Sequence, residues 1–228
     1  MEPETRPAVF MGLVKVGIFI VVLAAAFFLC AGRLDLAMAW IYIAVIFVNT
    51  GITSLLMDPE LIEERSGIGK DTKRWDIVPA VLMGRVGPLA FLIVAGLDVR
   101  FGWSPEMSLA VRIGAFGIAL LGMLITDWAV VSNRFFSGVV RIQRERGHSV
   151  VITGPYRYVR HPGYAGAILH NMAEPVLLGS LWALVPAGLV AVVTIVRTAM
   201  EDRTLQEELE GYEPYAERVR YRLLPFLW

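Results

Sequence analysis

The chain has little of what a soluble enzyme or a secreted domain usually contains. Its 228 residues include one cysteine and three histidines, 18% of them are charged, and the formal net charge is zero. A single cysteine excludes a disulfide framework and a metal site built from several thiolates, so we expect no metal centre. The zero net charge gives no electrostatic reason to expect a nucleic acid as partner. The Gly-rich strand–turn–helix sequence of a soluble nucleotide-binding fold is also missing.

Apolar sequence is what the chain has in excess. Hydrophobic residues make up 56% of it, and the mean hydropathy is +0.60. Four runs reach the roughly 20 residues needed to cross hydrocarbon: Ala8–Ala31, Leu36–Met57, Ile77–Leu97 and Met107–Val131. Two more, Gly163–Gly179 and Leu181–Thr198, form the arms of a hairpin. We predict an all-α fold, a polytopic membrane helical bundle with four long spanning helices, a C-terminal helical hairpin and cytoplasmic amphipathic helices.

Arginine and lysine are unevenly distributed between these runs. The loops on one side of the predicted bundle keep only Arg33 and Arg100, and the segments on the other side hold most of the remaining cations. Cytoplasmic loops are enriched in these residues. We therefore expect an integral protein of the plasma or inner membrane with both termini in the cytoplasm.

The first polar cluster is the run from Gly154 to Gly166, which leads directly into the hairpin. Pro162 suits the first turn of a helix, which places His161 at its N-cap. Free N–H groups there, together with Arg160, would attract an anion. Tyr156 and Tyr164 offer flat faces for a nucleobase or a lipid. The alternative is that these side chains only anchor the chain at the headgroup level.

The second cluster follows the hairpin. Arg197 and Glu201 are four residues apart and share a helix face, and Asp202 comes next. Paired carboxylates can hold a ribose diol or a cationic amine. The alternative is a surface ion pair of about 0.3–0.5 kcal/mol. Both clusters fall at the cytoplasmic face, so we expect a cytoplasmic active site.

Several separate motifs occur together in the order found in one family. They are Gly154-Pro-Tyr, Arg160-His-Pro-Gly-Tyr-Ala-Gly166, Arg197 with Glu201-Asp202, and Gly211-Tyr-x-x-Tyr215 through Pro225. Residues 115–228 resemble the isoprenylcysteine carboxyl methyltransferase and phospholipid methyltransferase superfamily of integral-membrane enzymes. We therefore divide the chain into N-terminal transmembrane helices, 1–114, and a catalytic, cofactor-binding membrane domain with cytoplasmic C-terminal helices, 115–228.

The resemblance implies S-adenosylmethionine as the methyl donor and a lipid-like or prenylated acceptor. It implies that the cofactor is bound by Tyr156, Arg160, His161, Pro162, Tyr164, Glu201, Asp202, Tyr212 and Tyr215. Arg197 and Glu201 are the catalytic candidates, with Arg197 orienting the acceptor. The family's element has two glutamates, and Asp202 replaces the second one here.

Ionisable residues inside the predicted helices are candidates for substrate binding, because they are costly in a membrane. Arg85 and Glu174 fall at similar depth, so we expect either that they pair and close the floor of a substrate cavity or that Glu174 meets a cationic headgroup. Asn171 is a further candidate for a hydrogen bond to the substrate. A structural salt bridge is the alternative.

Three other functions compete with methyl transfer. A sterol-type membrane reductase using NADPH shares an Arg-His-x-x-Tyr element, but Pro162 and the Glu201-Asp202 pair favour the methyltransferase. A non-catalytic scaffold would bind no cofactor, and a transporter would gather its polar groups at mid-membrane. Membrane lipids are expected partners. The acceptor's identity and the oligomeric state stay open.

Overall fold

The computed structural model describes residues 5–65 and 71–228. Within these ranges every regular element is helical, which confirms the predicted fold class. Residues 1–4, at the N-terminus that we expect in the cytoplasm, lie outside the described residues. The long helices are α1 (Thr5–Ala31), α2 (Ala37–Leu56), α5 (Gly87–Phe101), α6 (Leu109–Ser132), α7 (Pro162–Leu178) and α8 (Leu184–Glu208).

The remaining elements are short. They are α3 (Pro59–Arg65), η1 (Arg74–Asp76), α4 (Ile77–Val81), the π-helical turn η2 (Leu82–Val86), η3 (Arg144–Arg146), η4 (Gly154–Arg157) and α9 (Tyr212–Arg218). The elements η1, α4, η2 and α5 follow one another without a break and together form one apolar span, Arg74–Phe101.

Five segments are long and apolar enough to cross a membrane: Phe10–Ala31, Ala37–Leu56, Arg74–Phe101, Leu109–Ser132 and Leu184–Glu208. Four of them are the predicted long helices. The fifth is α8, which continues past the predicted hairpin arm to Glu208, and only its partner α7, with 17 residues, is short. The chain is therefore an integral membrane protein.

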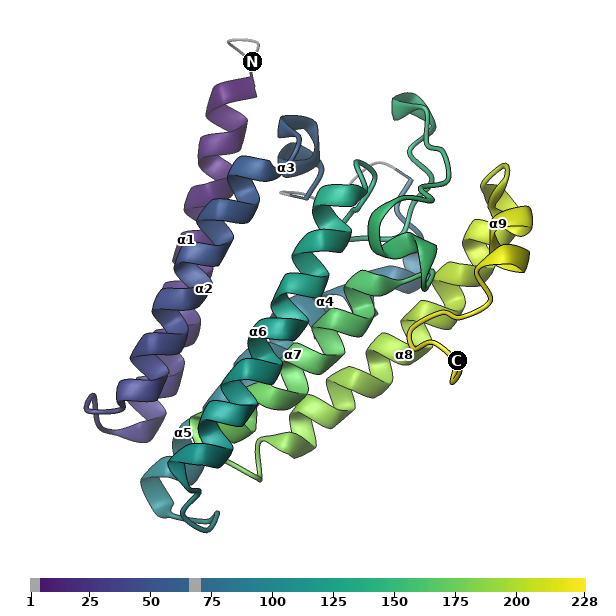
Figure 1. The fold of residues 1–228 in the computed structure, drawn as a ribbon. Coiled ribbons are helices and arrows are strands. Elements are labelled where there is room, and N and C mark those ends of the chain that lie inside the picture. The colour runs from purple at the N-terminus through teal and green to yellow at the C-terminus, as the bar shows by residue number, and fades with distance from the viewer. Residues whose placement is uncertain (1–4, 66–70) are drawn as a thin grey trace.

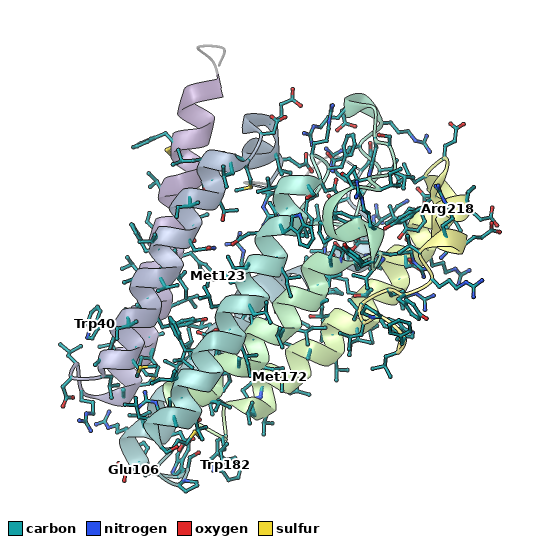
Figure 2. All side chains as sticks on the ribbon, viewed as in Figure 1. Trp40, Glu106, Met123, Met172, Trp182 and Arg218 are labelled. Atoms are coloured by element: carbon teal, nitrogen blue, oxygen red, sulfur yellow. The ribbon has the colours of Figure 1, made fainter. Side chains whose placement is uncertain are left out.

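The bundle has two parts that pack against each other. The helices α1 and α2 lie side by side at one edge, and α6, α7 and α8 follow in succession across the rest (Figure 1). Behind them α5 packs against both α1 and α8. The elements α3 and α9 lie at the end of the bundle where α7 begins (Figure 1). Glu106 and Trp182 lie at the opposite end from Arg218 (Figure 2).

The closest helix pair, α6 and α7, is fixed by two glycines. A Cβ atom on Gly122 would lie 2.6 Å from the carbonyl oxygen of Gly166, and one on Gly166 would lie 2.5 Å from the carbonyl oxygen of Gly122. Small residues allow such contact between membrane helices. The pair sets the position of α7, whose N-terminal end carries the first polar cluster.

The segment between α6 and η4 differs from the amphipathic surface stretch that its sequence pattern indicates. Residues 133–153 are irregular apart from the short turn η3. Gln143 is buried there and donates a hydrogen bond from its side chain to the Phe135 carbonyl, 2.8 Å away. Val140 is tied to the segment before α4, because its N–H donates to Asp76 at 2.6 Å. These internal contacts hold the segment against the bundle.

Candidate functional site

The corner where η4 meets α7 is held by the C-terminal part of the chain. Pro162 is the first residue of α7 and is buried, with His161 at the N-cap. The Arg160 N–H donates to the Tyr221 carbonyl at 2.9 Å, and the His161 N–H donates to the Arg222 carbonyl at 2.8 Å. Two segments far apart in sequence are therefore paired backbone to backbone beside the site.

Asp202 of α8 is the centre of this corner. Its side chain is fully buried, and its carboxylate forms a bidentate pair with Arg160, at 2.7 Å to Nε and 2.9 Å to Nη2. Arg222 Nε lies 2.9 Å from the same carboxylate and the Tyr212 hydroxyl 3.0 Å from it. His161 Nε2 lies 3.2 Å away. A buried carboxylate needs such partners to offset its desolvation.

Every side-chain nitrogen of Arg160 has a hydrogen-bond partner in this arrangement. Its remaining nitrogen, Nη1, donates to the backbone carbonyls of Ala216, Val219 and Arg220. The sequence analysis expected Arg160 to hold an external anion. In the structure the anion it holds is the carboxylate of Asp202, so Arg160 positions the C-terminal segment.

Glu201 and Asp202 are adjacent but face different surroundings, because successive residues of an α-helix point about 100° apart. Asp202 points into the corner. Glu201 is half-buried, and its carboxylate accepts a hydrogen bond of 2.5 Å from the Tyr164 hydroxyl. Glu201 is thus the member of the pair that keeps accessible surface.

Arg197 has a partner that the sequence pattern did not indicate. Its Nε and Nη2 atoms lie 2.6 and 2.9 Å from the two carboxylate oxygens of Asp76, and Nη2 also donates to the Gly138 carbonyl at 3.0 Å. The guanidinium carbon lies 5.3 Å from the centre of the Tyr164 ring. A buried guanidinium requires a counter-charge. Arg197 is thus paired with Asp76 and lies beside the Tyr164 ring, and its expected role in orienting an acceptor stays a prediction.

A cavity of about 90 Å³ lies between the irregular segment and α7, α8 and α9, and we call it the loop cavity. Seven of the nine predicted cofactor-binding residues line it: Tyr156, Arg160, His161, Tyr164, Glu201, Tyr212 and Tyr215. Pro162 and Asp202 lie behind this lining. The irregular segment supplies the opposite wall, with Asn133, Phe135, Phe136, Ser137, Val139, Val140, Arg141, His148, Ser149, Val150 and Val151.

The tyrosines of the loop cavity are neutral hydrogen-bond donors. Burial raises the pKa of Tyr156, Tyr212 and Tyr215 above the ordinary value. The Tyr215 hydroxyl donates to the Tyr156 carbonyl at 2.8 Å, and the Tyr156 hydroxyl accepts from the Asn133 amide at 3.2 Å. These bonds fix the rings that form the floor of the cavity.

His148 is a cavity residue that the sequence analysis missed. Its ring stacks on Phe135 with 4.6 Å between the ring centres, and its Nδ1 accepts a hydrogen bond from the Gln143 N–H at 3.2 Å. Burial, with smaller contributions from Arg141 and Arg146, lowers the pKa of His148 to about 4. The imidazole is therefore neutral at pH 7 with its proton on Nε2. No sequence motif surrounds it that would have indicated this position.

The N-terminus of α7 is not an open anion site. A Cβ atom built on Gly163 would lie 2.6 and 2.7 Å from two ring atoms of Phe136. The phenyl ring therefore covers the first turn of the helix. The sequence analysis expected an anion at this helix end, and the structure has an apolar contact there instead.

A second cavity, the membrane cavity, lies deeper in the bundle between α1, α2, α5, α6 and α7. Its volume is about 310 Å³, and both Asn171 and Glu174 line it. Met123 of α6, labelled in Figure 2, is also part of the lining. Two of the three predicted substrate-binding residues therefore share one cavity.

Arg85, the third, is elsewhere. It lies on the π-helical turn η2 with an exposed side chain, and no ion pair joins it to another residue of the described chain. Glu174 is instead 3.8 Å from His170 Nε2, one turn earlier on α7. The expected Arg85–Glu174 pair is wrong, because similar depth along two helices does not place side chains on facing sides.

Comparison with known proteins adds an independent observation. Residues 115–207 match the isoprenylcysteine carboxyl methyltransferase family. The match confirms the resemblance. A probable protein-S-isoprenylcysteine O-methyltransferase of Oryza sativa subsp. indica is 31% identical over 118 residues, which cover 48% of this chain and 59% of that protein.

Two other relatives of the isoprenylcysteine carboxyl methyltransferase family are similar over shorter stretches or at lower identity. Protein-S-isoprenylcysteine O-methyltransferase B of Arabidopsis thaliana is 28% identical over 47% of this chain and 57% of its own length. The protein-S-isoprenylcysteine O-methyltransferase of Schizosaccharomyces pombe is 36% identical over 67 residues, or 29% of this chain and 28% of its own. The chain thus spans less than three fifths of the length of these relatives.

The match to the methyltransferase family covers only part of the site. It includes the α7 corner, Glu174, Arg197 and the Glu201-Asp202 pair, and it ends at residue 207. Tyr212, Tyr215 and Arg222 come after it, and Asp76 precedes it. Asp76 lies 121 residues from Arg197 in sequence, so no local pattern connects the two.

Proposed function

We propose that this protein is an integral-membrane methyltransferase that uses S-adenosylmethionine and acts on a prenylated acceptor with a free carboxylate. The observation that carries the proposal is the meeting of seven motif residues around the loop cavity, five of them within the segment that matches the methyltransferase family. The names of these relatives, all protein-S-isoprenylcysteine O-methyltransferases, support the acceptor class.

The chemistry of the loop cavity fits this cofactor. Aromatic faces suit an adenine, and the Glu201 carboxylate suits ribose hydroxyls or an ammonium group. The neutral His148 offers a further N–H donor. When bound, S-adenosylmethionine supplies an electrophilic methyl group for an in-line displacement.

The protein's own contribution is positioning and the exclusion of water. Tyr164 is held between its hydrogen bond to Glu201 and the guanidinium of Arg197, which is itself fixed by Asp76. A carboxylate acceptor needs no general base. The site therefore has to bring two ligands together in a dry space, and none of its residues has to move a proton.

The volume of the loop cavity adds a condition. At about 90 Å³ it is well below the roughly 300 Å³ of the smallest ordinary ligand pockets. We propose that binding moves the irregular segment 133–151 outward, because this wall has no regular structure. Amide hydrogen exchange in this segment should change when the cofactor product S-adenosylhomocysteine is added, and an unchanged pattern would contradict the proposal.

The acceptor's tail is proposed to enter from the membrane. Tyr164, Ala167, Asn171 and Glu174 are spaced three, four and three residues apart, so they follow one face of α7 from the loop cavity to the membrane cavity. The polar end of the acceptor would then meet Tyr164 while its chain lies beside α7. The distribution of arginine and lysine supports a cytoplasmic position for the polar end.

The first experiment is binding of radiolabelled S-adenosylmethionine to the purified protein, with S-adenosylhomocysteine as competitor. Glu201→Gln should reduce affinity about tenfold or more, because it removes a charged hydrogen-bond acceptor from the cavity. Glu207→Gln is the matched control, since Glu207 lies on the same helix but pairs with Arg203 at the surface. Absence of competed binding to folded protein would overturn the proposal.

Acceptor class is tested by supplying S-farnesyl cysteine with a free carboxylate, and phosphatidylethanolamine in a parallel reaction. A labelled methyl ester, recognised by the labelled methanol that mild base releases from it, is expected only from S-farnesyl cysteine. The reductase alternative predicts NADPH binding, and no compared relative carries a reductase name.

A further inference from the structure

The membrane cavity is unusually polar for a space between spanning helices. Its lining includes Asn49, Thr50, Thr126, Asp127, His170, Asn171 and Glu174 among aliphatic and aromatic side chains. A smaller cavity of about 60 Å³ adjoins it and shares Glu174 as its single acidic residue. A plain hydrocarbon chain would offer no partner to any of these polar groups that the protein itself leaves unsatisfied, at a cost for each such group.

Some of these groups satisfy one another. The Asn49 amide donates to Asp127 at 2.8 Å. His170 is held at both ring nitrogens, by the Tyr42 hydroxyl at 2.9 Å and by the Ala119 carbonyl at 3.1 Å. Since a carbonyl only accepts, Nδ1 carries the proton, and the Tyr42 hydroxyl donates to Nε2.

Glu174 is not satisfied in this way. It is only 6% exposed, and His170 Nε2, its ion-pair neighbour in the described chain, is 3.8 Å away, too far for a hydrogen bond. The Tyr42 hydroxyl also interacts with the Glu174 carboxyl group, but its single proton is directed to His170, so the acceptor capacity of the carboxyl group is left free. No hydrogen bond within the described chain accounts for the Asn171 amide, three residues earlier on α7 and in the same lining. No lysine or arginine is among the described lining residues.

We infer that the membrane cavity binds an amphiphile whose prenyl chain carries a hydrogen-bond donor, a hydroxyl or an amine, which the Glu174 carboxyl group accepts. This rests on the proposed function for the claim that the amphiphile is the methyl acceptor. It deepens that function, since it distinguishes the acceptor from a lipid with an unbroken hydrocarbon tail.

The position of Glu174 sets where that donor lies. Tyr164 and Glu174 are ten residues apart on α7, which corresponds to about 15 Å along the helix at 1.5 Å per residue. The reacting carboxylate of the ligand and the hydroxyl or amine on its chain are therefore separated by about 15 Å. A ligand with its donor close to the reacting end would not reach the carboxyl group.

The inference is tested with two tritiated probes, S-farnesyl cysteine and its analogue with a hydroxyl at the far end of the farnesyl chain. Binding to the full-length protein in lipid nanodiscs is measured by equilibrium dialysis. The hydroxylated probe should bind about fivefold more tightly, the effect of one net hydrogen bond of about 1 kcal/mol. Equal affinities, or tighter binding of the plain probe, would overturn the inference.

Variants place the preference at Glu174. In Glu174→Leu the tighter binding of the hydroxylated probe should disappear or reverse. In Glu174→Gln part of this preference should remain, because the glutamine side chain still accepts a hydrogen bond. Thr194→Val is the control, because Thr194 is a buried polar residue of α8 bonded to its own helix and absent from both cavity linings. A preference that survives in Glu174→Leu would also overturn the inference. Unchanged S-adenosylhomocysteine binding in each variant verifies that it is folded.

Methyl transfer to the same probes separates this inference from the proposed function. If the hydroxylated probe binds preferentially but neither probe is methylated, the methyltransferase proposal fails and the cavity inference stands. If both are methylated equally and bind equally, the function stands and the inference fails.

Discussion

At the scale of single residues, the candidate site depends on how two adjacent carboxylates are used. The Asp202 carboxylate is buried and bonded to Arg160 and Arg222, whereas the Glu201 carboxylate accepts one hydrogen bond and remains partly accessible to solvent. The motif Glu201-Asp202 therefore combines a structural acid with an available one. The substitution of the family's second glutamate by Asp202 falls on the buried member, whose surroundings come from Arg160 and Arg222.

Replacing Asp202 by asparagine should destabilise the protein by about 3–5 kcal/mol, because it leaves the buried guanidinium of Arg160 without a counter-charge. The change is measured as reversible unfolding in mixed micelles. Glu207→Gln, which breaks an exposed pair on the same helix, should cost no more than about 1 kcal/mol. Equal losses in the two variants would refute this account of the corner.

His148 gives the irregular segment a dependence on pH. Its pKa is lowered from about 6.5 to about 4 by burial, so between these values the unfolded chain binds more protons than the folded one. This contribution to stability is complete above about pH 6.5 and is lost as the pH falls toward 4. The thermal midpoint of the wild type should therefore fall relative to that of His148→Gln across this window. Parallel curves would contradict the prediction.

At the scale of elements, the helices were predictable and the segments between them were not. Runs such as Met107–Val131 are long and apolar, so their state follows from length and composition. Residues 133–153 have basic and apolar residues in a pattern that indicates a surface stretch, but their fold depends on buried contacts of Gln143 and Val140. The Asp76–Arg197 pair could not be predicted either, since it joins elements 121 residues apart.

The packing of α6 on α7 predicts opposite effects for two glycines. Gly166→Ala should destabilise by about 1–3 kcal/mol, because the new Cβ would lie 2.5–2.8 Å from atoms of Gly122 and Thr126. Gly114→Ala on α6 should be neutral or stabilise by up to about 1 kcal/mol, since no atom lies within 4 Å and alanine favours the helix. The free energy of unfolding of both variants is compared with that of the wild type. An unchanged value for Gly166→Ala would show that α6 and α7 move apart at little cost.

At the scale of the whole molecule, the two ends of the bundle differ in character. One end carries the loop cavity, α9 and Arg218, and the other carries Glu106 and Trp182 (Figure 2). The domain division into 1–114 and 115–228 stays a prediction. Helices from both parts line the membrane cavity, so this cavity does not belong to the C-terminal part alone.

The orientation predicted from the arginine distribution can be tested with single cysteines. In a Cys30→Ser background, Arg218→Cys should react with a membrane-impermeant maleimide only after the cytoplasmic face is opened, and Glu106→Cys should react in intact cells. Both positions are exposed and lie at opposite ends of the bundle. The reverse labelling pattern would place the site outside the cell.

The hydrogen bonds and ion pairs around the Asp202 carboxylate limit how short a fragment of this chain can be. The part that matches the methyltransferase family stops at residue 207, yet Tyr212 and Arg222 supply two of the bonds to the Asp202 carboxylate, and Tyr221 and Arg222 pair with the α7 corner through their backbones. A fragment limited to the matched residues would contain Glu201 and Asp202 but would lack Tyr212 and Arg222, which bond to the buried Asp202 carboxylate. The part of this chain that holds the Asp202 corner together is therefore longer than the stretch that matches the family.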